Sequence, residues 1–391
     1  MPGPAASPAL CIGLMSGTSL DGVDGVLVDF AAQPPRVLAS HGLPLPPGLR
    51  DELLALNASG SDELHRAAVA AHQLTQVYAE VVQALLAASG TPASAVQAIG
   101  AHGQTVRHHP PGAWLRGRRV DAQDSEFPPY TLQLNQPSLL AELSGIAVVA
   151  DFRSRDIAAG GQGAPLVPAF HREVFGQPGS SVAVVNIGGI ANVTALTGDG
   201  RVLGLDTGPG NMLLDLWCAR HTGARYDRGG AWGATGRADQ ALLAKLLAEP
   251  YFALQGIKST GRDLFHADWL QRQLQGFEAL AAADVQATLV ELTACSIAQA
   301  LRDLPWGEGA SLSELLVCGG GACNDALMTV LRRELAPCPV LTTAERGWPV
   351  DLVEAAAFAW LAWQTLQGLP GNLSAVTGAA GPRILGAIHP A

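Results

Sequence analysis

A short pattern that occurs twice constrains the fold of this chain most: an apolar strand, a turn with glycine, and a second strand. The first copy spans residues 9–30, where ALCIGLM leads into SGTSLDG and then into the alternating VDGVLVDF. The second copy spans residues 182–196, where the pair GG at 188–189 joins two apolar strands. Alternation of apolar and polar residues is typical of half-buried strands, and glycine permits the tight reversal between them. The repeat therefore predicts a duplicated α/β domain.

The rest of the chain alternates strands and helices, which supports this interpretation. Apolar residues with helical spacing occur in residues 51–90 and 284–304. A chain of 391 residues exceeds what one hydrophobic core usually serves, so we expect two domains. We predict a first domain at residues 1–150, joined by a C-terminal tail of about residues 370–391, and a second domain at residues 151–369.

The charge of the chain limits the kinds of partner that it is expected to bind. A formal net charge of −10 disfavours nucleic acid or an anionic membrane as the main partner. Lysine occurs only as Lys245 and Lys258, so a bound phosphate must be held by backbone N–H groups, hydroxyls, arginine or a metal ion. There is no run of about 18 apolar residues, no basic start typical of a signal peptide, and no CxxC pair. We therefore expect a soluble cytoplasmic protein.

Four glycine-rich turns, each after an apolar strand, predict a phosphate site. A backbone N–H can approach a phosphate closely where no Cβ intervenes, and α/β sheets bind ligands at the carboxyl ends of strands. The chain has no GxxxxGK[ST], no GxGxxG after its first strand and no GxSxG, which disfavours P-loop enzymes, dinucleotide-binding enzymes and serine hydrolases of the elbow type. The four turns are residues 17–22, 188–189, 208–210 and 319–321.

Two carboxylates stand next to these turns. Asp21 lies in the hydroxyl-rich first turn, beside Thr18 and Ser19, and could hold a hydrated Mg2+. Asp206 ends an apolar strand just before Gly208, which places it at the mouth of a sheet. For each of the two carboxylates, a plain turn residue is the alternative interpretation.

Eight segments, in order along nearly the whole chain, resemble the anhydro-N-acetylmuramic acid kinase family. The segments GTSLDGVD and GGQGAPLVP are the most specific of them. The matching stretches are GLMSGTSLDGVD at 13–24, HGQT at 102–105, ADFRSRD at 150–156, GGQGAPLVPAFH at 160–171, NIGG at 186–189, GLDTGPGN at 204–211, CGGGACN at 318–324 and VTGAAGPRILGAIHP at 376–390.

The resemblance implies a fold and a reaction. The fold is the two-domain actin/hexokinase-like α/β fold, a duplicated ribonuclease H-like domain with ATP and sugar in an interdomain cleft. The implied reaction opens the anhydro bridge of 1,6-anhydro-N-acetylmuramic acid with water and phosphorylates O6, giving N-acetylmuramic acid 6-phosphate and ADP in peptidoglycan recycling. ATP and Mg2+ are the implied cofactors. A homodimer is common among the proteins that the chain resembles.

The resemblance also implies roles for single residues. Asp206 matches the catalytic base of the family, and Thr207 stands where other members carry Cys. Arg155 is the expected partner of the lactyl carboxylate or a ring hydroxyl, with Arg153 as the competing candidate. The sugar contacts are expected from His102, Gln104, Arg155 and Glu354, the metal contact from Asp21, and the ATP contacts from Gly17, Thr18, Ser19, Leu20, Asp21, Gly22, Val23, Asp24, Gly188, Gly189, Gly319, Gly320 and Gly321.

Other functions remain open at this point. A kinase of the same fold could phosphorylate a free hydroxyl without opening a ring, and an ATP-binding regulator could lack catalysis altogether. A glycoside hydrolase could use Asp206 and Glu354 as its two carboxylates, although this leaves the four glycine turns unexplained. A metal site made of His102, His108 and His109 fits the composition, but no cysteine or carboxylate at ligand spacing supports it.

Overall fold

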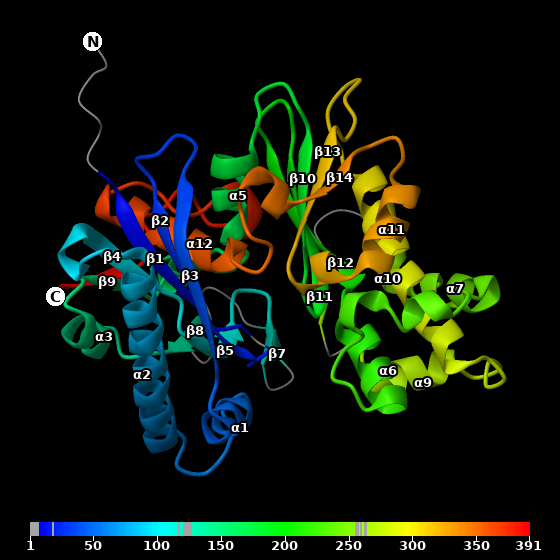
Figure 1. Ribbon diagram of the computed structural model, residues 1–391, viewed down its shortest axis with the longest axis horizontal. Coiled ribbons are helices and arrows are strands. Elements are labelled where there is room, and N and C mark those ends of the chain that lie inside the picture. The colour runs from blue at the N-terminus through cyan, green and yellow to red at the C-terminus, as the bar shows by residue number, and fades with distance from the viewer. Residues whose placement is uncertain are drawn as a thin grey trace. The chain divides into compact units, whose positions relative to one another are not determined.

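The chain divides into two compact units in the computed structural model (Figure 1). Unit 1 comprises Met1–Val174 and Leu352–Ala391, and unit 2 comprises Phe175–Asp351. The structure describes residues 8–17, 19–115, 118–119, 127–254, 258, 260–261 and 264–391.

Unit 1 is built on a six-stranded mixed sheet in the order β15-β9-β4-β1-β2-β3. Strands β1, β2 and β3 form an antiparallel meander, whereas β4 is parallel to β1 and β9 is parallel to β4. A second, two-stranded sheet joins β5 and β8, and a short hairpin joins β6 and β7. The strands are β1 (Leu10–Met15), β2 (Gly22–Asp29), β3 (Arg36–Pro44), β4 (Val96–Ala101), β5 (Gln104–His109), β6 (Trp114–Leu115), β7 (Arg118–Arg119), β8 (Tyr130–Leu134), β9 (Val148–Ala150) and β15 (Ala387–His389).

Helices cover this sheet through apolar faces. Helix α2 buries Leu74, Tyr78 and Leu85 against the strands, and these side chains are fully buried. Glycine at position 25 lets α2 approach β2, because a Cβ there would lie 2.3 Å from a methyl carbon of Val81. The helices are α1 (Pro47–Ala55), α2 (Glu63–Ser89), η1 (Ala93–Ala95), α3 (Pro137–Ser144), α4 (Ser154–Ala158), α5 (Val167–Phe175), α12 (Val353–Leu366) and α13 (Ser374–Thr377).

Unit 2 is built on a five-stranded sheet in the order β12-β11-β10-β13-β14. Strands β10, β11 and β12 form an antiparallel meander, and β13 and β14 continue in parallel beyond β10. The strands are β10 (Val182–Ile187), β11 (Ile190–Leu196), β12 (Val202–Pro209), β13 (Glu314–Cys318) and β14 (Val340–Thr342).

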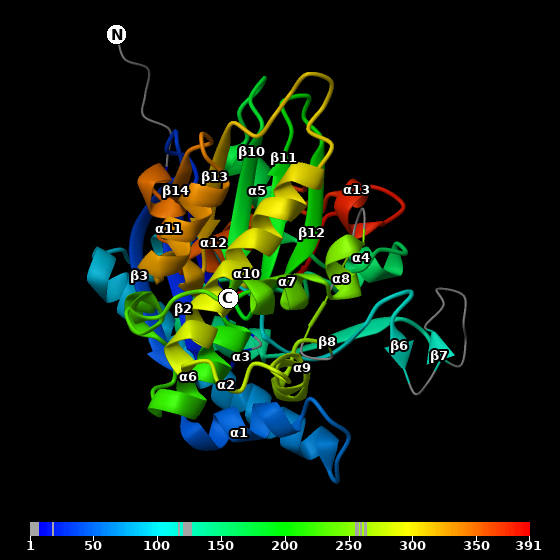
Figure 2. The ribbon, with the colours of Figure 1, turned by 90° about the vertical axis from the view of Figure 1, so that its right-hand side faces the viewer.

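The long helix α10 packs across the face of β11 and β12 (Figure 2). Its residues Val285, Leu289, Leu292 and Ile297 are buried, as their helical spacing predicts. The helices of this unit are α6 (Met212–Thr222), η2 (Arg228–Gly230), η3 (Gly233–Thr235), α7 (Gln240–Leu247), α8 (Pro250–Ala253), α9 (Ala267–Gln273), α10 (Ala282–Asp303), η4 (Gly320–Cys323), α11 (Asp325–Glu334) and η5 (Thr343–Arg346).

The two units repeat one topology. In each, a three-stranded antiparallel meander is extended on its first strand by two parallel strands, so that β3-β2-β1-β4-β9 corresponds to β12-β11-β10-β13-β14. The glycine turns at 17–22 and 188–189 occupy the same place in this pattern, between the first and second strands. The predicted duplicated α/β fold is confirmed.

The predicted boundaries, near residues 150 and 370, differ from the observed division. Helix α12 belongs to unit 1 because its backbone lies directly on β1 and β4, which Figure 1 shows beside it. A Cβ on Gly13 would lie 1.8 Å from the carbonyl oxygen of Ala355, and one on Gly100 would lie 2.0 Å from that of Phe358. Such a close approach depends on backbone shape, which the strand and helix pattern alone does not reveal.

Within the described residues, no helix combines the length and apolar character needed to cross a membrane.

Candidate functional site

Three of the four predicted glycine turns meet at one edge of the sheet of unit 2. The turn Gly188–Gly189 joins β10 to β11 and lies against the end of β12. The N–H of Gly210 donates to the carbonyl of Gly189 at 2.9 Å, and the N–H of Asn211 donates to that of Gly188 at 2.8 Å. These bonds tie the start of α6 to the β10–β11 turn.

The third turn, Gly319–Gly321, follows β13 and packs on the end of β10. A Cβ on Gly321 would lie 2.3 Å from a methyl carbon of Ile187, and Gly319 has a φ of 77°. The side-chain amide of Asn211 donates to the carbonyl of Ile187 at 3.0 Å. The carboxyl ends of the parallel strands β10 and β13 thus present three glycine turns at one edge, which is where α/β sheets bind ligands.

The glycines at this edge fall into two classes. Packing within the unit requires some of them, because a Cβ on Gly210 would lie 2.4 Å from the carbonyl oxygen of Gly188. For Gly188, Gly189 and Gly320, the nearest atom to such a Cβ would be 3.6, 3.8 and 3.5 Å away, which is ordinary van der Waals contact. None of these three has a positive φ. The fold itself therefore has no need of glycine at these three positions.

Asp206 lies on β12, an edge strand of this sheet, and forms three hydrogen bonds with Tyr251, Lys258 and Thr260. Its carboxylate accepts from the N–H of Thr260 at 3.0 Å. Its main-chain N–H donates to the carbonyl of Lys258 at 2.9 Å, and its carbonyl accepts from the hydroxyl of Tyr251 at 2.7 Å. A β-bulge at Thr207, opposite β11, changes the register directly after Asp206.

Burial sets the protonation of Asp206. It raises the pKa of the carboxyl from 3.8 to about 6, and the hydrogen bond from Thr260 opposes part of this rise. The negative charge of Asp206 in turn contributes to the raised pKa of Tyr251, which burial raises most. A carboxyl group whose pKa lies only a little below neutral pH is ionised there and still binds a proton readily, which suits general-base catalysis.

The first glycine turn lies in unit 1, between β1 and β2. Ser19 and Asp21 are exposed, whereas Leu20 is buried at a φ of 57°. In β2, Val23 is fully buried, so only its backbone can meet a ligand. The predicted contact Thr18 lies outside the described residues.

The two glycines of this turn also differ in whether packing within the unit requires them. Gly17 has room for a Cβ, with Ser19 Oγ 3.8 Å away, whereas a Cβ on Gly22 would lie 2.5 Å from the carbonyl oxygen of Leu43. Asp24, the last of the predicted contacts, is exposed.

A polar cluster in unit 1 brings together His102 and Glu354, two of the predicted sugar contacts. Arg153 joins them: its Nε and Nη2 lie 3.1 and 2.9 Å from Nε2 of His102, and its Nη1 donates to the carbonyl of Gly163 at 2.8 Å. Burial lowers the pKa of Arg153 to about 10, against the charges of Glu354 and Asp156, which raise it. A guanidinium held between a neutral ring and a carboxylate is the charge pattern that recognises an anionic group.

Protonation states in this cluster follow from burial and charge. Burial, followed by the charge of Arg153, keeps the pKa of His102 well below its usual value, so the imidazole is neutral. Burial raises the pKa of Glu354, and so does Asp24, whereas Arg153 lowers it. Arg153 is therefore the cation that faces the carboxylate of Glu354.

The remaining predicted sugar contacts differ in their surroundings. Arg155, the second residue of α4, is exposed and is not brought into this cluster. Gln104 is 1% exposed, and its Oε1 has no hydrogen-bond partner. A buried oxygen without a donor is costly, which favours a donor supplied by a ligand or water.

The histidine metal site is not supported. His102 is engaged by Arg153, whose positive charge opposes a bound cation at the same ring. Nδ1 of His108 lies 3.1 Å from the hydroxyl of Thr131. Burial lowers the pKa of His108 to about 4, with a further contribution from Arg153.

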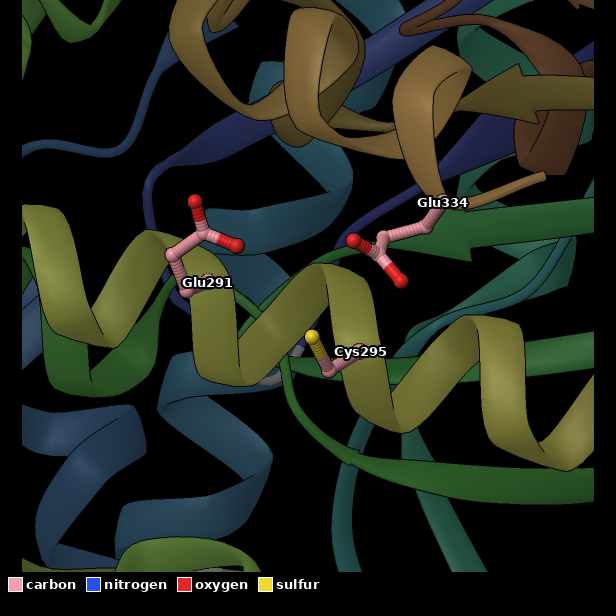
Figure 3. Close-up of side chains that lie close together, drawn as sticks. All are labelled: Glu291, Cys295 and Glu334. Atoms are coloured by element: carbon pink, nitrogen blue, oxygen red, sulfur yellow. The ribbon is translucent and has the colours of Figure 1, made fainter. Parts of the chain in front are cut away.

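Another group of potential metal ligands, Glu291, Cys295 and Glu334, lies between α10 and α11 (Figure 3). Both carboxylates are already paired, because Arg333 donates to Glu291 and also to Glu334. Burial, with the neighbouring carboxylates, raises the pKa of the Cys295 thiol to about 11. The group therefore forms an ion-pair network between two helices, and its thiol is protonated.

Sequence reasoning missed the residues that hold Asp206. Tyr251 donates its hydroxyl to the main-chain carbonyl of Asp206, and Thr260 donates its main-chain N–H to the carboxylate. Hydrogen bonds that involve main-chain atoms leave no sequence motif. Lys258 was notable only because lysine is scarce.

Comparison with known proteins decides the family. The sequence profile of the anhydro-N-acetylmuramic acid kinase family matches residues 9–391. The chain belongs to this family. It is 56% identical to the anhydro-N-acetylmuramic acid kinase of Bordetella petrii over 389 residues, covering 98% of this chain and 96% of the relative. Identity to the kinase of the same name from Variovorax paradoxus is 55%, covering 98% of this chain and 99% of the relative. For that of Cupriavidus metallidurans it is 52%, with both chains covered completely.

Proposed function

We propose that this enzyme converts 1,6-anhydro-N-acetylmuramic acid, ATP and water to N-acetylmuramic acid 6-phosphate and ADP, in the recycling of peptidoglycan. The partly buried carboxylate of Asp206, held by Thr260 and with its pKa raised by burial to about 6, is the observation that supports this reaction best. Membership of the kinase family and the glycine turns of unit 2 agree with it. A homodimer and a cytoplasmic location remain predictions.

Asp206 acts as the general base. It takes a proton from a water molecule, whose oxygen attacks the anomeric carbon of the sugar. The bond from this carbon to O6 breaks, and the electron pair stays on O6. O6 then attacks the γ-phosphorus of ATP, and the bond to the β,γ-bridging oxygen breaks to release ADP. The proton remains on Asp206 until it passes to solvent.

The glycine edge of unit 2 supports the role of ATP. Gly188, Gly189 and Gly320 leave space beside the backbone that the fold does not use, and N–H groups can meet phosphate oxygens there. Gly319 and Gly321 shape the same edge for contact with adenine and ribose. Gly17 in unit 1 is of the same open kind, in a turn that also offers the exposed Ser19.

Asp21 suits a hydrated magnesium ion. Its carboxylate is exposed in a turn, and Mg2+ is commonly held by one or two carboxylates while it keeps several waters. When bound, Mg2+ would neutralise charge on the phosphates.

The polar cluster of unit 1 supports recognition of the sugar. The lactyl carboxylate of the sugar needs a cation as its partner, and Arg153 can supply one. Arg153 is held in place by His102 and by the carbonyl of Gly163. Glu354 can accept from a sugar hydroxyl, and Oε1 of Gln104 lacks a donor that a hydroxyl or amide could supply.

The substitution Asp206→Asn tests the base. It should lower turnover by about 10^2- to 10^4-fold, the usual loss for a general base. The asparagine oxygen can still accept from Thr260, so ATP affinity should hardly change. Steady-state kinetics and calorimetric titration with ATP measure the two effects.

Stability provides the control for this variant. The folded pKa of about 6 lies above the unfolded value of 3.8, so ionisation costs stability as the pH rises through this window. At pH 7 the asparagine variant avoids this cost. Its free energy of unfolding should therefore be about 1–2 kcal/mol higher than that of the wild type, a value that allows for the partial exposure of Asp206. Turnover close to wild type, with or without a stability change, would contradict the assignment.

Two neighbouring glycines test the ATP site. Gly320→Ala places its Cβ 3.5 Å from the nearest atom and should fold normally, but it should raise the KM for ATP about tenfold by obstructing the phosphate or nucleoside. Gly321→Ala places its Cβ 2.3 Å from Ile187 and should instead lose about 1–3 kcal/mol of stability. Urea unfolding and ATP kinetics of both variants measure this. An unchanged KM in Gly320→Ala would count against an ATP site here.

The pair Arg153→Ala and Arg155→Ala identifies the sugar contact. Loss of a charge-assisted contact should lower kcat/KM for the sugar about 10- to 100-fold. The cluster geometry predicts this loss at Arg153 and a small effect at the exposed Arg155, whereas the family resemblance alone favours Arg155. Circular dichroism of both variants checks their folding. A loss confined to Arg155→Ala would refute the role proposed for Arg153.

A further inference from the structure

Lys258, one of only two lysines in the chain, has its ammonium group directed at main-chain carbonyls. Nζ donates to the carbonyls of Tyr251 and Phe252 at 3.3 Å each and to that of Leu254 at 3.1 Å. Helix α8 ends at Ala253, and the last carbonyls of a helix lack intrahelical partners. The lysine therefore closes the end of this short helix.

The same residue reaches the catalytic strand through its backbone. The carbonyl of Lys258 accepts from the main-chain N–H of Asp206 at 2.9 Å, and Thr260, two residues on, donates its N–H to the carboxylate. Tyr251, at the other end of the segment, donates its hydroxyl to the carbonyl of Asp206. Tyr251, Lys258 and Thr260 thus contact both main-chain polar groups and the carboxylate of the proposed base.

The chemistry of an ammonium group fits this position. It carries three protons on a single atom, and three carbonyls converge on it. Nζ also lies 4.9 Å from the centre of the Tyr251 ring, within the range of a cation–π interaction. With these carbonyls as acceptors, Lys258 is not arranged as a phosphate ligand.

Helix α8 also packs against the end of β12. A Cβ on Gly208 would lie 2.7 Å from the Phe252 ring, and the φ of Gly208 is 144°. A shift of α8 would therefore move both the wall behind β12 and the donors around Asp206.

We propose that Lys258 is a positioning residue for catalysis: its ammonium group holds residue 258 against the end of α8, so that Thr260 and the Lys258 carbonyl hold Asp206 in its reactive orientation. This inference rests on the proposed role of Asp206. Lys258 acts through these hydrogen bonds, and no contact of its side chain with substrate is required.

The variant Lys258→Met tests this role, with Lys245→Met as the matched control. Lys245 also donates to a carbonyl, that of Gln275 at 2.9 Å, and lies 5.4 Å from the centre of the Phe277 ring. We expect kcat to fall about 10- to 100-fold in Lys258→Met, because small displacements of catalytic groups cost this much, with the KM for ATP nearly unchanged. Lys245→Met should keep wild-type kcat.

A pH profile separates positioning from a general loss of structure. Without the Thr260 hydrogen bond, the pKa of Asp206 should rise above about 6, so the acidic limb of kcat should move to higher pH. Among the described residues, the charged or titratable groups near this region include Tyr251 on α8, Lys258 itself, Arg302 and Asp303 on α10, and Glu334 on α11. Burial lowers the pKa of Lys258, and the charge of Asp303 opposes this. Tyr251 has a raised pKa and stays neutral through this range.

Rates are normalised to the folded fraction from circular dichroism, and Lys258→Gln, which also removes the ammonium group, replaces the methionine variant if that does not fold. Carbon-13 NMR of labelled aspartate, assigned with Asp206→Asn, reads the pKa of Asp206 without turnover, so it separates failure of this inference from failure of the proposed reaction. A higher pKa together with reduced kcat supports the inference. An unchanged pKa, or a kcat equal to that of Lys245→Met, would overturn it.

Discussion

Desolvation of the Asp206 carboxylate is the constraint on which the proposed chemistry depends. The side chain lies within an edge strand, which continues to Pro209, and one flank of β12 is open to partners other than β11. The sequence predicted instead that Asp206 ends its strand. Within the described residues, α8, Lys258 and Thr260 lie on that flank and partly bury the carboxylate, and Thr260 donates its N–H to it. More donors would make the carboxylate a weaker base, and more solvent would lower its pKa toward the usual value.

Glycine serves two different purposes in this protein. At Gly13, Gly100 and Gly321 the missing Cβ lets parts of one unit touch, and substitution there would collide with backbone or branched side chains. At Gly188 and Gly320 a Cβ would make only ordinary van der Waals contacts, at 3.6 and 3.5 Å. Sequence alone presents both kinds as glycine after a strand, and only the distances separate those that build the fold from those that are free for a ligand.

The sequence revealed much of the fold because its signals were local. The repeated strand, turn and strand predicted the duplication, and the apolar spacing of α10 predicted its buried face. The compact units differ from the predicted domains at α12, whose docking on β1 depends on a close backbone approach at Gly13. This contact joins residues more than 300 positions apart, and no local pattern encodes it.

For the candidate site, too, local sequence signals were informative and contacts that depend on the fold were not. Motifs predicted Asp206, His102 and Glu354 as site residues, since His102 follows β4, Glu354 lies in the first turn of α12, and Asp206 precedes the Gly-Pro-Gly of residues 208–210. The choice between Arg153 and Arg155 could not be made from spacing, because the two lie on different sides of one short helical turn. The hydrogen bonds that hold Asp206 run through main-chain atoms, which every residue possesses.

The most direct measurement of the central claim is mass spectrometry of the product formed from 1,6-anhydro-N-acetylmuramic acid and ATP in water enriched in oxygen-18. If Asp206 activates water to open the bridge while O6 takes the phosphoryl group, one heavy oxygen should appear at C1 and none on the phosphate of the product. A phosphorylated product without label at C1, or label introduced at the same rate when ATP is omitted, would contradict the account.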